Sequence, residues 1–213
     1  MKAVAILPVK RFPVAKRRLG TGMSGRRRRD LVSAMVADVL EAISAARTIE
    51  QILIVSGEPQ VAKLAHAVGA EVIDDPDDRG HSEAAISGIK RATELGATVA
   101  VLLPGDCPLL DPRELDGLLT GIPERYVAIV PDRHGTGTNA LVLAPPDAIR
   151  PAFGEGSRLR HEDSARGAGL PWSVQELASL ALDLDTPADL VALTRAVAED
   201  PSRGKRVAKA LAL

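Results

Sequence analysis

The sequence is poor in several residue types, and each shortage excludes a class of protein. Cys107 is the one cysteine among 213 residues, so the chain can form neither an internal disulfide nor a cysteine-based zinc site. Aromatic residues make up 2% of the chain, which leaves few rings for stacking nucleic-acid bases. The formal net charge is -1, so a general affinity for nucleic acid is not expected.

Long apolar runs are also missing. The first run, Ala3 to Leu7, follows Met1 and Lys2 directly and stops at Pro8, well short of the roughly 18 residues that a membrane span needs. We therefore expect a cytoplasmic protein with no membrane and no nucleic-acid partner. What is present is an ordinary globular composition, with 46% hydrophobic and 26% charged residues, in a chain long enough for one domain with a proper core.

Strand and helix signals alternate along the chain. Short apolar runs without polar alternation are typical of strands that are buried on both faces. Alternation of such strands with helices, through short loops, indicates an α/β fold with a mostly parallel sheet. We predict strands at 3–7, 51–56, 71–74, 99–103, 126–130, 140–143 and 180–184, and helices at 25–46, 60–68, 82–95, from 112, from 157 and at 188–197.

Polar residues and prolines mark the expected helix starts. Ser24 and Ser82 are predicted N-caps, because a serine hydroxyl can accept a hydrogen bond from the first turn. The segment from Asp111 to Glu114 combines an N-cap, a proline at the first helical position and a capping-box glutamate. Thr186-Pro187 marks the start of the last predicted helix.

The loop after the first strand is strongly basic. Five of the nine residues from Lys10 to Arg18 are Lys or Arg, at the edge of the sheet where open α/β folds bind ligands. A triphosphate is the natural counter-charge, since Lys supplies point charges and Arg a bidentate fork for phosphate oxygens. The alternative is a loop whose charges only face solvent.

Two acidic segments far apart in the sequence indicate one cation site. Asp106 follows the apolar run Val99 to Leu103, at the carboxyl end of a predicted central strand. Asp183 lies in the predicted strand 180–184 and Asp185 directly follows it, so in extended chain both carboxylates face the same side and can bind one hard cation. Each segment alone is also explained by a turn or by solvent-exposed acids. Together they predict a magnesium site at the ligand-binding edge.

Two further loops are rich in glycine and hydroxyl groups. Asp132 to Asn139 precedes a strand, so it is either a hairpin turn or an anion cradle, and not a Walker loop or a Rossmann fingerprint. Phe153 to His161 opens a short helix, in which Ser157 is either the cap or a substrate ligand. The histidines are left without a catalytic role. His161, beside Arg160, either touches a substrate or, as we expect, lies at the surface.

Six motifs follow one another along the chain: Pro8-Val9-Lys10, Ala15-Lys16-x-Arg18-Leu19, Gly105-Asp106-x-Pro108, Asp132-Arg133-x-Gly135-Thr136-Gly137-Thr138, Phe153-Gly154 with Ser157, and Asp183-x-Asp185-Thr186-Pro187. In this combination, from about Ala5 to Leu193, the chain resembles the phospholactate/phosphoenolpyruvate guanylyltransferase family, whose members serve biosynthesis of the deazaflavin coenzyme F420. The resemblance implies the nucleotide-diphospho-sugar transferase fold, a Rossmann-like mixed, mostly parallel sheet flanked by helices. Residues 1–195 would form the nucleotidyltransferase domain and 196–213 a loosely attached C-terminal tail.

The resemblance also implies the reaction and its partners. GMP would pass from GTP to the phosphate of a three-carbon acid, with Mg2+ as cofactor and pyrophosphate as the second product. The acceptor would be phosphoenolpyruvate, 2-phospho-L-lactate or 3-phospho-D-glycerate. Phosphoenolpyruvate is preferred because the loop from Asp132 to Thr138 looks most like that of bacterial members. A homodimer is compatible with the sequence.

Residue roles follow from the same resemblance. One departure stands out, because relatives often carry Leu-Asn where this chain has Ser82-Glu83, which makes Gly80 to Glu83 candidate nucleotide contacts. The implied roles are magnesium binding by Asp106, Asp183 and Asp185, nucleotide binding by Lys10, Lys16, Arg18, Gly105 and Glu83, catalysis by Asp106, Lys16 and Lys10, and acceptor binding by Thr138, Gly154 and Ser157.

Two other functions fit the same residues. A cytidylyl- or uridylyltransferase acting on a sugar or alcohol phosphate would use the same aspartates and differ around Glu83 and in the acceptor loops. A non-catalytic domain would bind a nucleotide with magnesium and turn over no acceptor.

Overall fold

A computed structural model describes residues 1–13, 15–16, 19 and 23–212. Within these residues, seven strands form one sheet in the order β3-β2-β1-β4-β6-β5-β7. Strands β1, β2, β3 and β4 are parallel to one another, β6 runs antiparallel to both β4 and β5, and β7 is parallel to β5. The strands are β1 (Ala3–Pro8), β2 (Ile49–Ser56), β3 (Glu71–Asp74), β4 (Val99–Leu102), β5 (Tyr126–Pro131), β6 (Thr138–Ala144) and β7 (Trp172–Val174).

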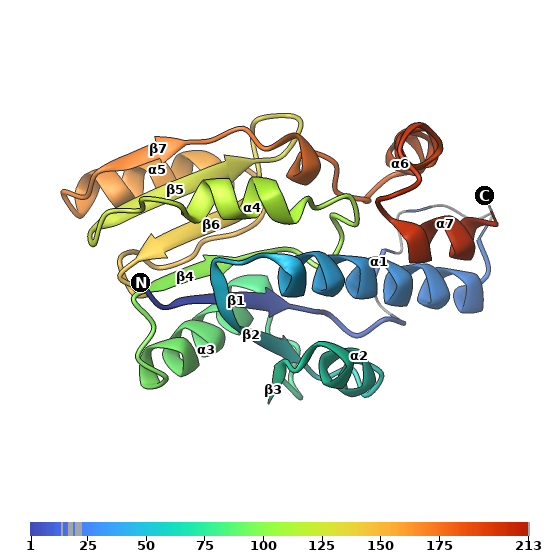
Figure 1. Cartoon of the computed structure of the whole chain (residues 1–213), viewed down its shortest axis with the longest axis horizontal. Coiled ribbons are helices and arrows are strands. Elements are labelled where there is room, and N and C mark those ends of the chain that lie inside the picture. The colour runs from blue at the N-terminus through green and yellow to red at the C-terminus, as the bar shows by residue number, and fades with distance from the viewer. Residues whose placement is uncertain (14, 17–18, 20–22, 213) are drawn as a thin grey trace.

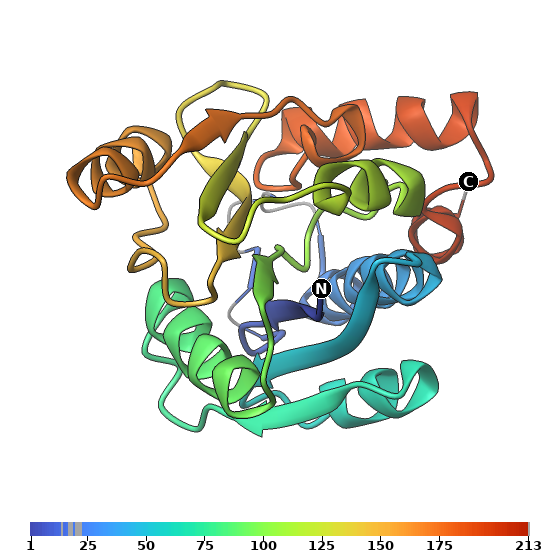
Figure 2. The same ribbon diagram turned by 60° about the vertical axis from the view of Figure 1, so that its left-hand side comes forward.

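Helices cover both faces of the sheet (Figures 1 and 2). In Figure 2, α3 and α5 lie on one side of the strands, and α1, α4, α6 and α7 lie on the other. The helices are α1 (Gly25–Ala45), α2 (Val61–Val68), α3 (His81–Glu94), α4 (Pro112–Leu119), α5 (Ser157–Gly167), α6 (Pro187–Glu199) and α7 (Lys205–Leu211), with a 3-10 turn η2 (Ala178–Leu180). The predicted mixed, mostly parallel α/β sheet is confirmed.

Side chains alternate between two separate hydrophobic cores, as the two-residue period of a strand requires. On β1, Ala5 and Leu7 belong to the core under α1, whereas Val4 and Ile6 belong to the core under α3, and all four are fully buried. A side chain at Gly88 would lie 2.3 Å from Cγ2 of Ile6, so glycine there lets α3 approach β1 closely. This contact packs the middle of α3 against the second half of β1.

The stretch predicted as a strand at 180–184 is not one. Leu180 ends the η2 turn, and residues 181–184 are irregular, with no strand partner in the described part of the chain. The apolar-acidic alternation there reflects a buried anchor, Leu184, which is 1% exposed between the half-buried Asp183 and the exposed Asp185. The three-residue strand β7, in contrast, was not predicted, because it is too short to show a periodic pattern.

Three predicted caps also need correction. Gly80, with φ 104°, is the N-cap of α3, and the Ser82 hydroxyl instead accepts a hydrogen bond from the Phe153 N–H at 3.0 Å. Gly156 precedes α5 in the left-handed conformation, so Ser157 is its first helical residue and not its cap. Glu114 does not complete a capping box, because its carboxylate accepts hydrogen bonds from Ser179. The caps at Ser24 and Asp111 are confirmed, and the helix start predicted at Thr186-Pro187 is confirmed with Thr186 as its N-cap.

The C-terminal segment is more firmly attached than predicted. Helix α6 continues to Glu199, and α7 packs against α1 with Val207 fully buried. Asp38 of α1 accepts hydrogen bonds from the backbone N–H groups of Arg206 and Val207, at 3.1 and 2.9 Å. An acid from one helix therefore caps the N-terminus of another, which the sequence pattern did not reveal.

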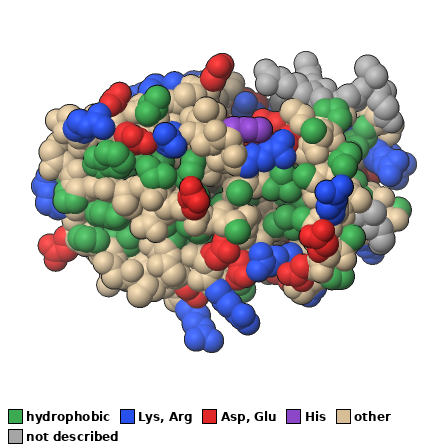
Figure 3. All heavy atoms as spheres, turned by 90° about the horizontal axis from the view of Figure 1, so that it is seen from above, with side chains coloured by type: hydrophobic (Ala, Val, Ile, Leu, Met, Phe, Trp, Pro, Cys, Tyr) green, Lys and Arg blue, Asp and Glu red, His purple; other side chains and the backbone are tan. Residues whose placement is uncertain are grey.

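The surface carries both signs of charge. On the face in Figure 3, Lys and Arg side chains alternate with Asp and Glu, and neither sign covers a broad region. No helix among the described residues is long and apolar enough to cross a membrane.

Candidate active site

Most of the predicted site residues line one cavity. It has a volume of about 810 Å³ and lies beyond the carboxyl ends of β1 and β4. A neighbouring cavity of about 320 Å³ shares Lys10, Lys16, Asp106 and Asp185 with the first, and it adds Gly105 and the apolar side chains of Val9, Val32, Met35 and Val36. The predicted residues that line the larger cavity are Lys10, Lys16, Asp106, Thr138, Gly154, Ser157, Asp183 and Asp185.

A backbone hydrogen bond brings the two acidic segments together. The N–H of Leu184 donates to the carbonyl oxygen of Asp106 at 3.3 Å, so Asp183 and Asp185 flank a residue tied to the loop after β4. Asp183 is further held by Asn139, whose side-chain nitrogen lies 3.4 Å from its carboxylate. The Asp185 N–H donates at 3.0 Å to Asp189, the acid of the α6 capping box.

Lys16 joins two of these acids. Its ammonium group forms ion pairs with the carboxylate of Asp106 and, at 2.5 Å, with that of Asp185. Burial alone would lower the pKa of Lys16, but the two carboxylates outweigh burial and raise it. Lys16 is therefore a permanent positive charge at the centre of the site. Arg18, the other predicted phosphate contact of this loop, lies outside the described residues.

Asp183 lies in an environment that disfavours its negative charge. Burial and then the charge of Asp106 raise the pKa of Asp183. Among the residues that the structure describes, Asp106 itself has a buried oxygen, Oδ1, that finds no hydrogen-bond partner. An acidic pair that repels and an unpartnered buried oxygen both favour binding of a cation.

The donor set fits a hard divalent cation, although it does not form a finished ligand shell. Across residues 1–13, 15–16, 19 and 23–212, no three His, Cys, Asp or Glu side chains stand together as a metal-binding group. The carboxylates of Asp106, Asp183 and Asp185 face one cavity, and carboxylate oxygen is the ligand type that magnesium prefers. These three carboxylates are therefore chemically suitable ligands for magnesium.

The other side of the cavity carries hydroxyl groups. Thr138 begins β6, and Ser157 begins α5, where the Ser157 hydroxyl donates a hydrogen bond to Oγ1 of Thr138 at 3.0 Å. Gly154 has φ 109°, a conformation that side chains other than glycine rarely adopt, and its carbonyl accepts from the Ser157 N–H. Ser157 therefore does not cap α5, and it lines the cavity.

Two histidines lie here, and one of them is fully buried. His161, predicted at the surface, is fully buried and lies 3.1 Å from the Thr138 hydroxyl. The i, i+4 spacing from Ser157 to His161 places both residues on one face of α5. This spacing is the feature of the sequence from which the position of His161 beside Ser157 could have been predicted. His81 lines both cavities, and burial lowers its pKa to about 4.

Glu83 does not join the site. Its carboxylate forms an ion pair with Arg150 at 2.7 Å, and neither cavity includes it among its lining residues. Since α3 begins at His81, the side chain of that residue, and not of Glu83, turns toward the cavities.

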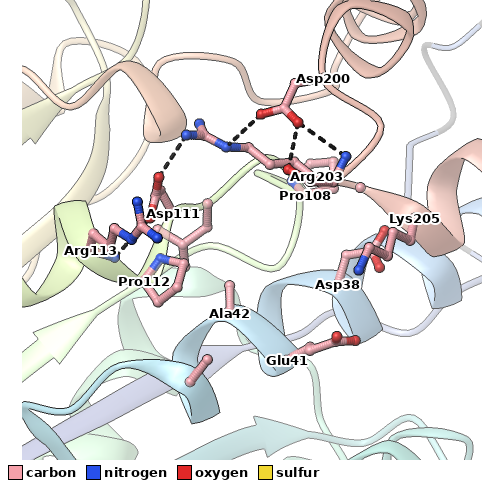
Figure 4. A pocket seen from close by; sticks show the side chains of 14 residues that line it. Asp38, Glu41, Ala42, Pro108, Asp111, Pro112, Arg113, Asp200, Arg203 and Lys205 are labelled. Atoms are coloured by element: carbon pink, nitrogen blue, oxygen red, sulfur yellow. Dashed lines mark hydrogen bonds and ion pairs between the residues drawn. The ribbon is translucent and has the colours of Figure 1, made fainter.

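A third cavity lies elsewhere and contains none of the predicted residues. It measures about 410 Å³ and lies between α1, the start of α4 and the turn from α6 to α7 (Figure 4). Its charged groups largely neutralise one another, since Arg203 pairs with Asp111 at 2.6 Å and with Asp200 at 3.3 Å. These pairs join α7 to the rest of the chain and leave no single sign of charge for a ligand.

Sequence comparisons identify close relatives. The family model for "Guanylyl transferase CofC like" matches residues 3–199. The phosphoenolpyruvate guanylyltransferase of Conexibacter woesei is 46% identical over 93% of this chain and 90% of that protein. The enzyme of the same name from Sphaerobacter thermophilus is 41% identical, over 89% and 91%. A 2-phospho-L-lactate guanylyltransferase from Methanothermobacter thermautotrophicus is 33% identical, over 89% and 83%.

Solved structures agree on the fold. A nucleotide-diphospho-sugar transferase structure from Desulfovibrio desulfuricans G20 has a TM-score of 0.72 at 19% identity, covering 94% of this chain and 90% of that one. A CMP:2-keto-3-deoxy-manno-octonic acid synthetase, complexed with CTP, has a TM-score of 0.62 at 17% identity, covering 94% and 100%. The predicted nucleotide-diphospho-sugar transferase fold is confirmed.

Proposed function

This chain belongs to the CofC-like guanylyl transferase family, and from that membership we propose that it transfers GMP from GTP to the phosphate of phosphoenolpyruvate. The second product is pyrophosphate, and the reaction serves coenzyme F420 biosynthesis. The proposal rests mainly on one cavity that combines two kinds of side chain. Lysines and aspartates lie on one side of it, and small hydroxyl-bearing residues lie on the other. Similarity to relatives named for phosphoenolpyruvate supports this acceptor over 2-phospho-L-lactate or 3-phospho-D-glycerate.

The reaction joins two anions, and the site must therefore reduce their repulsion. An oxygen of the acceptor phosphate attacks the α-phosphorus of GTP, the bond from that phosphorus to the bridging oxygen breaks, and pyrophosphate leaves with the electron pair. Lys10 and Lys16 lie where their charges can stabilise the triphosphate and the departing pyrophosphate. Gly105 lies beside them in the smaller cavity, where the protein backbone can approach the nucleotide closely.

No general base is required. A phosphate monoester is largely dianionic near neutral pH, because its second pKa is about 6, so the attacking oxygen already carries negative charge. Thr138 and Ser157 supply hydroxyl groups, and the loop at Gly154 supplies backbone, to hold the acceptor in line. Positioning of this kind accounts for much of catalysis in phosphoryl transfer.

Magnesium is part of the proposal. Asp106, Asp183 and Asp185 would hold it, and when bound it supplies positive charge next to the phosphate oxygens. Support comes from the unpartnered buried oxygen of Asp106 and from the shared cavity of the three acids.

The test is a matrix of nucleotides and acceptors. Purified protein with magnesium is incubated with each of GTP, ATP, CTP and UTP and with each three-carbon phospho-acid, and pyrophosphate release is measured. We expect the pair GTP and phosphoenolpyruvate to give the highest kcat/KM, with mass spectrometry showing the guanylylated acceptor. Preference for CTP or UTP with a sugar phosphate would overturn the proposal, as would nucleotide binding without turnover of any acceptor.

The same proposal includes the cellular location, the partners and the oligomeric state of the enzyme. GTP and phosphoenolpyruvate are cytoplasmic metabolites, so we place the reaction in the cytoplasm, with small molecules as its partners. Size-exclusion chromatography with light scattering tests whether the chain forms a homodimer.

A further inference from the structure

His161 is the buried polar side chain that directly adjoins the acceptor side of the cavity, and the implied roles leave it unused. We propose that His161 is a positioning residue, which directs a hydroxyl hydrogen of the Thr138-Ser157 pair toward an oxyanion of the acceptor. The identity of that acceptor rests on the proposed function. The inference itself concerns which hydrogens the site can donate, and it follows from three contacts.

The first contact sets the tautomer of the ring. Nε2 of His161 lies 2.9 Å from the backbone nitrogen of Ala152, whose N–H can only donate. Nε2 must therefore accept, so a neutral ring carries its proton on Nδ1. Burial, and then the charge of Arg160, lower the pKa of His161 to about 4, which keeps the ring neutral near pH 7.

The second contact uses that proton. Nδ1 lies 3.1 Å from Oγ1 of Thr138, so the ring donates to the threonine hydroxyl. The third contact, at 3.0 Å, joins the hydroxyls of Ser157 and Thr138. With Ser157 as donor, Oγ1 of Thr138 accepts from both neighbours and uses both of its lone pairs.

One hydroxyl hydrogen of the Thr138-Ser157 pair has no acceptor among the described residues of the protein. The two hydroxyls own two hydrogens, and one of them lies in the bond between Ser157 and Thr138. The other cannot return to His161, because Nδ1 of the ring is a donor. Neither hydroxyl has another acceptor within hydrogen-bond distance among the residues that the structure describes. That hydrogen is left for a ligand in the cavity, and the ligand must present an acceptor, such as a carboxylate or phosphate oxygen.

The ring is held firmly enough to do this. His161 is fully buried, and its ring packs edge-to-face against Phe153, with centroids 5.3 Å apart. Phe153 lies on the loop that also carries Gly154. The same histidine thus ties this loop, through Ala152, to the hydroxyl pair.

The test compares three variants at position 161. His161→Phe keeps a ring of similar size and removes both hydrogen bonds, whereas His161→Gln keeps an amide that can both donate and accept. We expect His161→Phe to raise the KM for phosphoenolpyruvate about tenfold and to leave the KM for GTP within about twofold, as loss of one bond to a charged group predicts. His161→Gln should recover much of this loss, and His161→Ala should not.

A matched control separates positioning from general damage. Val127→Ala creates a cavity at a fully buried apolar position of β5, outside the residues that line the site. It should lower the midpoint of urea unfolding while changing both KM values equally or not at all. An increase in KM for phosphoenolpyruvate in this control as large as that in His161→Phe would overturn the positioning role.

A double-mutant cycle with Thr138→Val gives the decisive result. If His161 acts through Thr138, the double variant should bind phosphoenolpyruvate no more weakly than Thr138→Val alone. Additive effects would mean that the histidine acts on binding independently of Thr138, which would overturn the proposed role. The cycle is read both from KM values and from calorimetric binding of phosphoenolpyruvate, so it does not depend on turnover. Failure of the proposed function would appear as an inactive wild type, whereas failure of this inference would appear as additive effects in the cycle.

Discussion

Replacing Asp106 by asparagine tests the centre of the site with almost no change of shape. The amide keeps the volume of the side chain and removes its charge. Asp106 is the acid that pairs with Lys16, has a buried unpartnered oxygen and lies beside Asp183. Loss of one preorganised electrostatic contact typically reduces kcat by about 10²- to 10³-fold. Because Asp106 interacts with the charges of both Lys16 and Asp183, we expect kcat to fall about 10³-fold. This fall corresponds to an increase of about 4 kcal/mol in the activation barrier.

Stability should change far less than activity. Removing one partner of a fully buried ion pair costs about 3–5 kcal/mol. Here the Asp106 side chain is 25% exposed, and Lys16 keeps its second ion pair with Asp185, so solvent and that pair reduce the cost to about 1 kcal/mol. Relief of the repulsion that raises the pKa of Asp183 offsets part of even this.

The assay is pyrophosphate release at saturating GTP and phosphoenolpyruvate, over a range of magnesium concentrations. Urea unfolding of the same preparations verifies the fold. Asp77→Asn is the matched control, because its side chain is 71% exposed and lies outside both cavities. If Asp106→Asn keeps kcat within tenfold of the wild type, with the same dependence on magnesium, the electrostatic reasoning is refuted.

Further changes probe the acceptor side, the C-terminal helix and the response to acid. Ser157→Ala removes a hydroxyl from the acceptor side and should raise the KM for phosphoenolpyruvate about tenfold but hardly that for GTP; an equal rise in both would remove Ser157 from the acceptor site. Asp38→Asn weakens the cap that holds Arg206 and Val207, and should lower the free energy of unfolding by about 1–2 kcal/mol in urea titrations; an unchanged midpoint would mean that α7 is held by its apolar contacts alone. The pKa of His161 is about 4 in the folded state, below its unfolded value near 6.5, so the unfolded chain binds more protons between these values. Folding stability should therefore fall as pH drops from 6.5 toward 4, by at most about 1.4 kcal/mol per pH unit from this group, and urea midpoints of His161→Phe should show a shallower fall than those of the wild type.

Local sequence signals were enough for the sheet and for most helix ends. Strands β1, β2, β4, β5 and β6 were anticipated because a buried strand needs an apolar run, and the more exposed β3 was anticipated as well. Parallel strands that are separated by helices can pair in few ways. The rule that ligands bind at the carboxyl ends of such strands placed Asp106 and the basic loop correctly at the cavity. The identity of the family could also be read from the motifs in their order.

Other features depend on contacts between segments far apart in the chain. Ser82 and Glu114 have the right chemistry for caps, but their partners in the fold are Phe153 and Ser179, at 71 and 65 residues of separation. No local pattern encodes such a choice, because a hydroxyl or a carboxylate bonds to whichever donor or acceptor packing brings within reach.

The amino-acid sequence by itself determined the alternation of strands and helices, the edge of the sheet that binds ligands, and the residue types available there. Only the tertiary structure decided that Asp183 and Asp185 meet Asp106 through an irregular segment and not through a strand. It also decided that His161 is buried, with a fixed proton, against the hydroxyl pair. The physical reason is that periodicity reports which face of an element is apolar, whereas burial and hydrogen bonding of a polar group depend on what the rest of the chain places against it.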